Sequence, residues 1–417
     1  MKLLTFLGTG KYSFTVYVWQ GQEYGSRFAP AASCHFLQPE GLIVFLTEEA
    51  RQQHYADLCQ ALPEGLEVQP IAIPPGRNEE ELWEIFAQVS GAVRPGEEVA
   101  FDITHGLRSL PMVGLLVAAF LRMGLNVPLR AVLYGAYEVR QPRGEADCTP
   151  MFDLSPMLSL LEWAAAAERF NRTGDARLLA GLLEGEHRAL AKKAQGDRVQ
   201  LATLRRLSNL AGALKDISQS LRLIRPQRAM EKIAGLARCL AEAQPALAYA
   251  PAARPFTLLL EGVQQAYQPL GLSNPAAPEE AGLALATQKA MIRWYLEREQ
   301  WVQAVTLARE WLVSWAMVQQ GRRRILNQAE RAAVEQALGA EARALFLSQQ
   351  EEGGRAALSL ASLPQREEAL SLWLALGQVR NDIDHAGMRE GAGEPQALLK
   401  QIQGCIARLD ALPMPEV

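Results

Sequence analysis

The sequence predicts a doubly wound α/β domain followed by an all-helical region. In residues 2–149, short runs rich in β-branched and aromatic residues alternate with segments of helical periodicity. After residue 156 the strand-like runs disappear, and long segments rich in Ala, Leu, Arg and Glu continue to the end of the sequence. Because 417 residues exceed what one hydrophobic core usually serves, we expect two domains, residues 1–150 and residues 151–417.

The amino-terminal elements alternate as a mostly parallel sheet requires. Strands separated by helices of about a dozen residues pair in parallel, with helices on both faces of the sheet. The predicted helices are residues 48–62, 78–91 and 109–124. The predicted strands are residues 3–8, 14–19, 41–47, 66–73, 97–104 and 129–135.

The carboxy-terminal region shows helical spacing only. Apolar residues recur at i, i+3, i+4 and i+7 in four long segments, residues 155–171, 197–224, 288–321 and 366–381. Clusters of Pro, Gly, Asn and Ala at residues 250–255 and 272–282 predict loops between helices.

Composition and charge exclude several classes of protein. A net charge of −4 argues against a protein that holds nucleic acid by overall electrostatics, so any such contact must be local. Five scattered cysteines without a C-x-x-C pair favour neither a disulfide framework nor a zinc site, and they fit a reducing cytoplasm. The longest apolar stretch, residues 110–121, is shorter than the roughly 20 residues that span a bilayer. We therefore expect a cytoplasmic protein without membrane contact or export.

Two loops of the α/β domain carry polar residues that a simple turn does not need. The first loop, "GTGKY", brings Gly8, Thr9 and Gly10 before Lys11 and Tyr12. The second, "DITHGLR", brings Asp102, Thr104, His105, Gly106 and Arg108 between a strand and a helix. Ligands of open parallel sheets bind beyond the carboxyl ends of the strands, and an arginine with exposed helix N–H groups suits phosphate. Together the loops predict an anion site.

Other interpretations of these loops stay open. The first loop is not a Walker A motif, because Thr5 stands where the first glycine is required. It is not G-x-G-x-x-G either, because Ser13 stands at the third glycine, which disfavours a nicotinamide-dependent enzyme. Both loops could be tight strand-to-helix turns without a ligand, and His105 could be an ordinary packed histidine.

The "DITHG" stretch resembles the motif of CRISPR-associated DxTHG proteins, and "LLTFLGTGKY" is similar to the first strand and loop of that family. The resemblance covers about the first 150 residues. It implies a CARF domain of Rossmann-like fold, which binds a cyclic oligoadenylate. It places residues 8–12 and 102–108 along the ligand pocket. It also favours cyclic tetraadenylate as the activator, and it leaves open that the domain slowly degrades this ring.

Near the carboxyl end, Arg380 and His385 stand five residues apart, with Asn381 after the arginine. Metal-free RNA cleavage needs a group that titrates near neutrality and a fixed cation, and histidine and arginine supply them. Five helical positions cover about 140° of arc, so one copy does not present both side chains on one narrow face. Two copies across a twofold axis could form the site, which would require a homodimer. The alternative is a solvated helix end.

"RNDIDH" resembles the R-x4-6-H motif of HEPN ribonucleases, including the polar residue after the arginine. The combined resemblance implies a CARF–HEPN protein of type III CRISPR antiviral defence. Such a protein is a metal-independent endoribonuclease of single-stranded RNA that a cyclic oligoadenylate activates. It implies that Arg380, Asn381 and His385 are catalytic and that a homodimer or higher oligomer is the active form. The alternative is a sensor that regulates a partner and catalyses nothing.

One further stretch offers cations to RNA phosphates. Residues 321–326, "GRRRIL", place three arginines together. Such a run is usually a solvated face, and that interpretation stays open as well.

Overall fold

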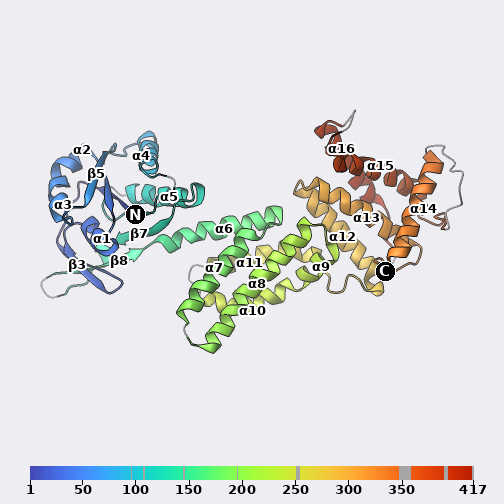
Figure 1. Ribbon diagram of the computed structural model, residues 1–417, viewed down its shortest axis with the longest axis horizontal. Helices are drawn as coiled ribbons and strands as arrows, with labels where there is room; N and C mark the ends of the chain where they lie inside the picture. The colour runs from blue at the N-terminus through green and yellow to red at the C-terminus, as the bar shows by residue number, and fades with distance from the viewer. Residues whose placement is uncertain are drawn as a thin grey trace. The chain divides into compact units, whose positions relative to one another are not determined.

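The computed structural model describes residues 1–94, 96–106, 109–143, 146–194, 196–249, 254–346, 358–388 and 393–415 (Figure 1). The chain divides into two compact units, Met1–Glu162 and Trp163–Val417, which we call the α/β unit and the helical unit. The predicted combination of an α/β sheet domain with a largely helical region is confirmed. Among the described residues, no helix combines the length and the apolar character needed to cross a membrane.

The α/β unit is built on one eight-stranded sheet with the strand order β3-β2-β8-β7-β6-β1-β4-β5. Five neighbouring strands of this sheet are parallel: β7 pairs with β6, β6 with β1, β1 with β4, and β4 with the edge strand β5. Antiparallel pairs join β7 to β8 and β2 to β3. The strands are β1 (Lys2–Leu7), β2 (Thr15–Trp19), β3 (Gln22–Ser26), β4 (Gly41–Leu46), β5 (Glu67–Ala72), β6 (Val99–Asp102), β7 (Leu129–Gly135) and β8 (Cys148–Asp153).

Helices cover both faces of this sheet, because alternate residues of each strand point to opposite sides. Leu4 and Phe6 of β1 pack with helices α4 and α5, whereas Leu3 and Leu7 pack with α1 and α3. Phe6 is 1% exposed, which places the centre of the sheet in the core. The helices are α1 (Ala29–Leu37), α2 (Glu48–Ala50), α3 (Ala56–Ala61), α4 (Glu79–Gly91) and α5 (Ser109–Gly124).

Three elements of this unit were not predicted. Strand β8 contains Pro150, which has no N–H for the ladder and breaks the strand pattern. Strand β3 is short, and its exposed residues include Gln22 and Glu23 at the edge of the sheet. Helix α1 is short as well and carries a proline in its first turn. Each is stabilised by its place beside the sheet rather than by a periodic sequence pattern.

The helical unit packs its helices around one continuous apolar core. The predicted run over residues 288–321 is two helices, because Glu299 takes a left-handed φ of 55° and ends the first. The predicted loop over residues 272–282 is found as far as a short 3-10 turn at Pro278–Glu280, and the next helix begins at Ala281. Of the other predicted loop, residues 250–253 lie outside the described residues, and a helix begins at Arg254. The helices are α6 (Ser155–Thr173), α7 (Arg177–Lys193), α8 (Arg198–Arg222), α9 (Pro226–Ala234), α10 (Leu236–Ala248), α11 (Arg254–Tyr267), α12 (Ala281–Glu297), α13 (Trp301–Gln319), α14 (Gln328–Phe346), α15 (Arg366–Asp384) and α16 (Pro395–Ala411).

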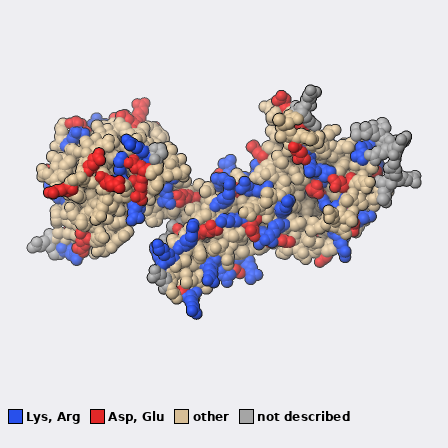
Figure 2. Space-filling view, in the orientation of Figure 1, with Lys and Arg blue, Asp and Glu red and all other residues tan. Residues whose placement is uncertain are grey.

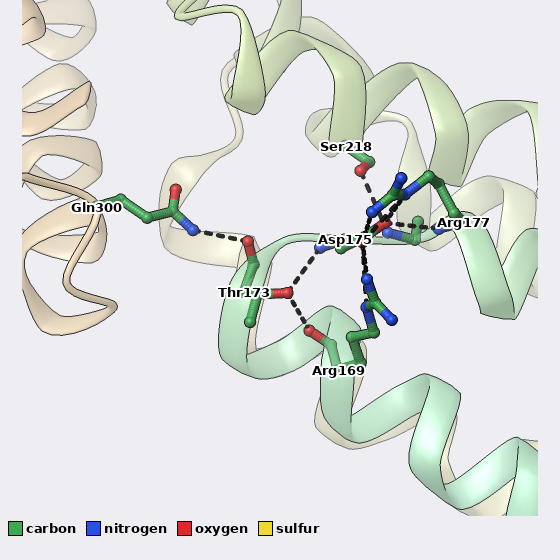
Figure 3. A network of polar contacts seen from close by, with 7 residues as sticks. Arg169, Thr173, Asp175, Arg177, Ser218 and Gln300 are labelled. Atoms are coloured by element: carbon green, nitrogen blue, oxygen red, sulfur yellow. Dashed lines mark hydrogen bonds and ion pairs between the residues drawn. The ribbon is translucent and has the colours of Figure 1, made fainter. Parts of the chain in front are cut away.

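The turn between α6 and α7 is held by one buried carboxylate (Figure 3). Asp175 Oδ2 accepts hydrogen bonds from Arg169 Nη2 at 2.7 Å and from Arg177 Nη2 at 2.6 Å. These arginines, with the backbone N–H of Arg177, hold the pKa of Asp175 well below its usual range. Gly174 has a φ of 73°, and a Cβ there would lie 2.7 Å from Trp294, so the turn requires glycine.

Replacing Asp175 with Asn is expected to lower the free energy of unfolding of the helical unit by about 1–2 kcal/mol, the low end for charged hydrogen bonds because both arginines are partly exposed. Tryptophan fluorescence during urea unfolding measures it. A carboxylate with a lowered pKa stabilises the fold above its unfolded pKa, and that stabilisation is lost as the pH falls. The difference between the two proteins should therefore shrink below about pH 4.

Glu168→Gln is the matched control for this prediction. Glu168 also pairs with an arginine, at 3.0 Å, but its side chain is 58% exposed. Exposed pairs of this kind contribute little, so the control should stay within about 0.5 kcal/mol of the wild type. Equal effects of the two substitutions would show that Asp175 has no special role in the turn.

Candidate functional site

The two predicted loops meet at the point where the strand order reverses. Strands β4 and β5 lie on one side of β1, whereas β6 and β7, which follow them in the chain, lie on the other side. The loops after β1 and β6 are in close contact there, because a Cβ on Gly8 would lie 3.2 Å from the Cα of Gly106. Ligands of open α/β sheets bind at this location. Glycine at position 8 allows the two backbones to approach each other.

A pocket of about 200 Å³, which we call the switch-point pocket, lies beside these loops. It combines aromatic rings with cations: Lys11 and Arg27 are exposed, whereas the Tyr17 ring is buried. Such a set can stack on bases and pair with phosphates. The described residues that line it are Lys11, Tyr12, Ser13, Tyr17, Arg27, Thr104, His105, Tyr134, Gly135, Tyr137 and Glu138.

Tyr12 closes the first loop on itself. Its hydroxyl donates to the carbonyl oxygen of Gly8 at 2.9 Å and accepts from the Gly8 N–H at 3.0 Å. Its ring lies against His105, with the two ring centroids 4.2 Å apart. Burial raises the pKa of Tyr12 to about 12, so the hydroxyl stays protonated at neutral pH. The loop is therefore shaped before any ligand arrives.

Asp102 and Thr104 join the second loop to its neighbours. Asp102 is fully buried, and its carboxylate accepts from the Ser33 hydroxyl on α1 at 2.5 Å and from the Thr104 N–H at 2.9 Å. Burial raises the pKa of Asp102 in spite of these donors. The Thr104 hydroxyl accepts from the backbone N–H of Gly135 in β7 at 2.8 Å. These side chains hold β6, β7 and α1 in position.

His105 caps the start of α1. Its Nε2 accepts from the backbone N–H of Ala29 at 2.9 Å, so the ring proton sits on Nδ1. The N-cap residue Phe28 supplies no side-chain oxygen, and His105 takes over that task. Burial, with a smaller effect of His54, lowers the pKa of His105 to about 3. The imidazole is neutral at physiological pH and is not free to accept a proton from a ligand.

Nuclear magnetic resonance tests this state of His105. Its ring C–H resonances should remain those of a neutral imidazole from pH 8 to about pH 4, whereas the same residue in urea should titrate near 6.5. Between those two pKa values only the unfolded chain binds the proton, so His105 makes the free energy of unfolding fall as the pH drops through this window. Titration of His105 near pH 6.5 in the folded protein would contradict the capping role.

The predicted ligand residues divide into three groups. Lys11, Tyr12, Thr104 and His105 line the switch-point pocket. A second group belongs to the two loops and does not line the pocket: Gly8, Thr9, Gly10, Asp102, which is buried, and Gly106. Arg108 lies outside the described residues.

Seven lining residues were missed by sequence reasoning. Tyr134 and Gly135 end strand β7, the neighbour of β6, and Tyr137 follows directly. The rule that ligands bind beyond strand ends, applied to "YGAYE", would have found this group. Tyr17 lies in β2, and Arg27 directly follows β3. Only the order of the strands in the sheet brings these two residues to the pocket. The missed residues are Ser13, Tyr17, Arg27, Tyr134, Gly135, Tyr137 and Glu138.

The second predicted group lies at the carboxyl end of α15. This helix packs against α13, α14 and α16 through an apolar face that includes Leu376 and Val379. Asn381 and His385 are exposed on the other side. The helix stops at His385 because Ala386 and Gly387 take left-handed φ values of 51° and 69°.

Arg380 is held by an acidic neighbour of its own helix. Its Nε lies 3.3 Å from Asp384 Oδ2, one helical turn on, and its side chain is 40% exposed. An exposed pair of this kind contributes little free energy, so a phosphate can compete for the guanidinium. Five helical positions put Arg380 and His385 about 140° apart around the axis. One copy of the chain thus offers the two groups separately.

One comparison with known proteins concerns mostly the helical unit. Residues 159–270 match the family model described as the second domain of CRISPR-associated protein MJ1674. Among curated proteins, the chain is similar to CRISPR-associated protein MJ1674 of Methanocaldococcus jannaschii, with 34% identity over 123 residues. This alignment covers 29% of the chain and 19% of the relative, so the chain spans about a fifth of the length of the curated relative it matches. Both matches are to a protein described as CRISPR-associated.

Proposed function

We propose that this chain is a cyclic-oligoadenylate-activated endoribonuclease of CRISPR antiviral defence that cuts single-stranded RNA without a metal ion. The observation that carries the proposal is the switch-point pocket, where four tyrosine rings and two exposed cations surround one cavity. A cyclic oligoadenylate presents purine faces and phosphates, which these groups can stack on and pair with. The resemblance of the pocket loops to CARF motifs and the CRISPR-associated family match favour the same function.

The size of the pocket supports a homodimer. About 200 Å³ lies below the 300–1,000 Å³ typical of small-molecule sites, so one copy holds only part of a ring. Two pockets across a twofold axis would share a ring of even number, and cyclic tetraadenylate is the proposed activator. The ring activates by binding the cutting arrangement of the dimer more tightly than the idle one, by about 1–3 kcal/mol.

The proposed cleavage site combines Arg380, Asn381 and His385 from both copies. The ribose 2′-hydroxyl attacks the adjacent phosphate, the bond to the 5′-oxygen breaks, and a 2′,3′-cyclic phosphate remains. His385 moves protons as general base or acid, Arg380 leaves Asp384 to stabilise the phosphorane charge, and Asn381 orients the phosphate. DNA lacks the attacking hydroxyl and should not be cut.

Two alternative functions make different predictions. A non-catalytic sensor that acts through a partner would bind the ring and leave RNA intact. A sensor that degrades its ring would need a group that accepts a proton near the phosphates. The neutral, capped state of His105 disfavours that residue as the base.

A cleavage assay decides among these functions. Purified protein is incubated with fluorescent single-stranded RNA and a panel of cyclic oligoadenylates, with and without a chelator, and the rings are recovered afterwards. The proposal predicts RNA cleavage only with the activating ring, at a rate that chelation leaves unchanged. Intact RNA with every ring, or cleavage that the chelator abolishes, would overturn it.

A further inference from the structure

Positive charge is concentrated in one part of the helical unit. Residues 177–249, which include α7 to α10, hold 13 Lys and Arg against six Asp and Glu, a net charge of +7. The whole chain has a net charge of −4, so the other residues together carry −11. Figure 2 shows Lys and Arg side chains gathered over this part of the unit on the face drawn.

Most of the local carboxylates are already occupied by other cations. Glu242 binds both Arg206, at 2.7 Å, and Arg238, at 2.9 Å. Glu184 pairs with Lys215 at 2.5 Å. The remaining exposed cations around the end of α7 and the start of α8 have no carboxylate within ion-pair distance among the described residues. We call them the α7–α8 basic surface: Arg188, Lys192, Lys193, Arg198 and Arg205.

The spacing of these cations suits a polymer of phosphates. Arg188 and Lys192 stand one turn apart on α7, about 6 Å along the axis, and Arg198 and Arg205 stand two turns apart on α8. An open groove of about 470 Å³ begins at Arg198 of this surface and lies between the start of α8 and the end of α10. Arg198 and Arg206 line it together with the apolar Val199, which is 78% exposed. Cations beside an apolar groove can follow a backbone and contact its bases.

We infer that the α7–α8 basic surface binds single-stranded RNA, apart from the residues proposed to cut it. The inference rests on the proposed function for the identity of the strand, whereas the charge and the groove carry the binding itself. The surface lies within the part of the chain that matches the family model, residues 159–270. The motif at Arg380 lies outside that range. Its role is to raise the local concentration of the RNA strand.

Salt dependence measures this contact directly. For single strands, log K falls with log salt at a slope of about −0.7 for each phosphate neutralised, so five contacts give a slope of about −3.5. The experiment follows the fluorescence anisotropy of a single-stranded RNA at several salt concentrations. The RNA has 20 nucleotides, a length on the order of the site sizes of single-strand binders. A His385→Ala background without ring keeps the RNA intact, so binding is read independently of cleavage.

Reversal of three charges should remove most of the binding. The variant Arg188→Glu, Lys192→Glu, Arg198→Glu is expected to bind at least tenfold more weakly, with the slope reduced by about 2. The same positions changed to Gln should reduce the slope equally, and circular dichroism checks that the helices remain. The matched control, Arg77→Glu, Arg94→Glu, Arg130→Glu, makes the same change of net charge at exposed residues of the α/β unit.

The outcomes separate this inference from the proposed function. Weaker binding in both α7–α8 variants and unchanged binding in the control support the surface, whether or not the wild type cuts RNA. Equal affinity and slope in the α7–α8 variants and the control would overturn it. Tighter binding of duplex DNA of the same sequence than of the RNA would overturn it too, because the surface would then belong to DNA.

Discussion

RNA cleavage by the ring-activated protein should fall about 10²- to 10⁴-fold when His385 is replaced by Ala, because the proposed general acid and base of the reaction is then missing. His385 is exposed at the end of the helix. The substitution should therefore leave the fold and the affinity for the ring unchanged. Single-turnover rates at saturating ring concentration measure the effect.

His187→Ala is the matched control for this variant, because it removes a histidine from helix α7 of the same unit. It should cut RNA at the wild-type rate. Arg380→Ala should lose activity to a similar degree, since the phosphorane charge then lacks its cation. Undiminished cleavage by His385→Ala would remove the residue from the mechanism and return the helix end to a solvated surface.

Tyr137→Ala should weaken binding of cyclic tetraadenylate by about 5- to 150-fold, since stacking of one base on an aromatic ring is worth about 1–3 kcal/mol. Tyr137 lines the switch-point pocket and is 37% exposed, and the guanidinium of Arg140 lies over its phenol ring at 4.2 Å. Because Tyr137 is exposed, removal of its side chain should leave the fold intact. A loss of affinity would therefore report the contact between Tyr137 and the ligand. Isothermal titration calorimetry measures it.

The control for this pocket variant is Tyr249→Ala. Tyr249 is 51% exposed in the helical unit, far along the chain from the pocket loops. Its replacement should leave the affinity for the ring unchanged. If Tyr137→Ala bound the ring as tightly as the wild type, the ligand would lie elsewhere.

The fold was predictable where one sequence pattern suffices. Buried parallel strands such as β1 and β4 are continuous apolar runs, and long helices such as α8 and α15 repeat apolar residues at helical spacing. Strand β8 was not predictable, because Pro150 opposes the pattern and only its neighbours β2 and β7 hold it. The break at Glu299 escaped for a similar reason: one left-handed residue leaves the apolar spacing almost unchanged.

The site was predictable as a location and less so as a set of contacts. The rule that ligands bind beyond the carboxyl ends of parallel strands predicted that the two loops lie side by side. The structure places Gly8 against Gly106. The polar residues of "DITHG" have a role that the sequence alone does not reveal. Asp102, Thr104 and His105 each bond to a backbone or side-chain group of a neighbouring element. Their chemistry maintains the shape of the pocket, and tyrosines from other strands line it.

The basic surface shows the limit of short motifs. The arginine run at residues 321–326 was the visible cationic stretch in the sequence. The larger excess of positive charge is spread over residues 177–249. In this range only Lys192–Lys193 and Arg205–Arg206 are adjacent cations in the sequence. Helical packing gathers these cations, since residues three, four and seven apart share a face.

One titration tests the central claim that a shared ring controls cleavage. Cyclic tetraadenylate is added stepwise to the wild-type protein, and ring binding and the rate of RNA cleavage are recorded in the same samples. Our account predicts that both saturate together at one ring for every two chains. Saturation at one ring per chain, or a cleavage rate that stays constant while the ring binds, would contradict it.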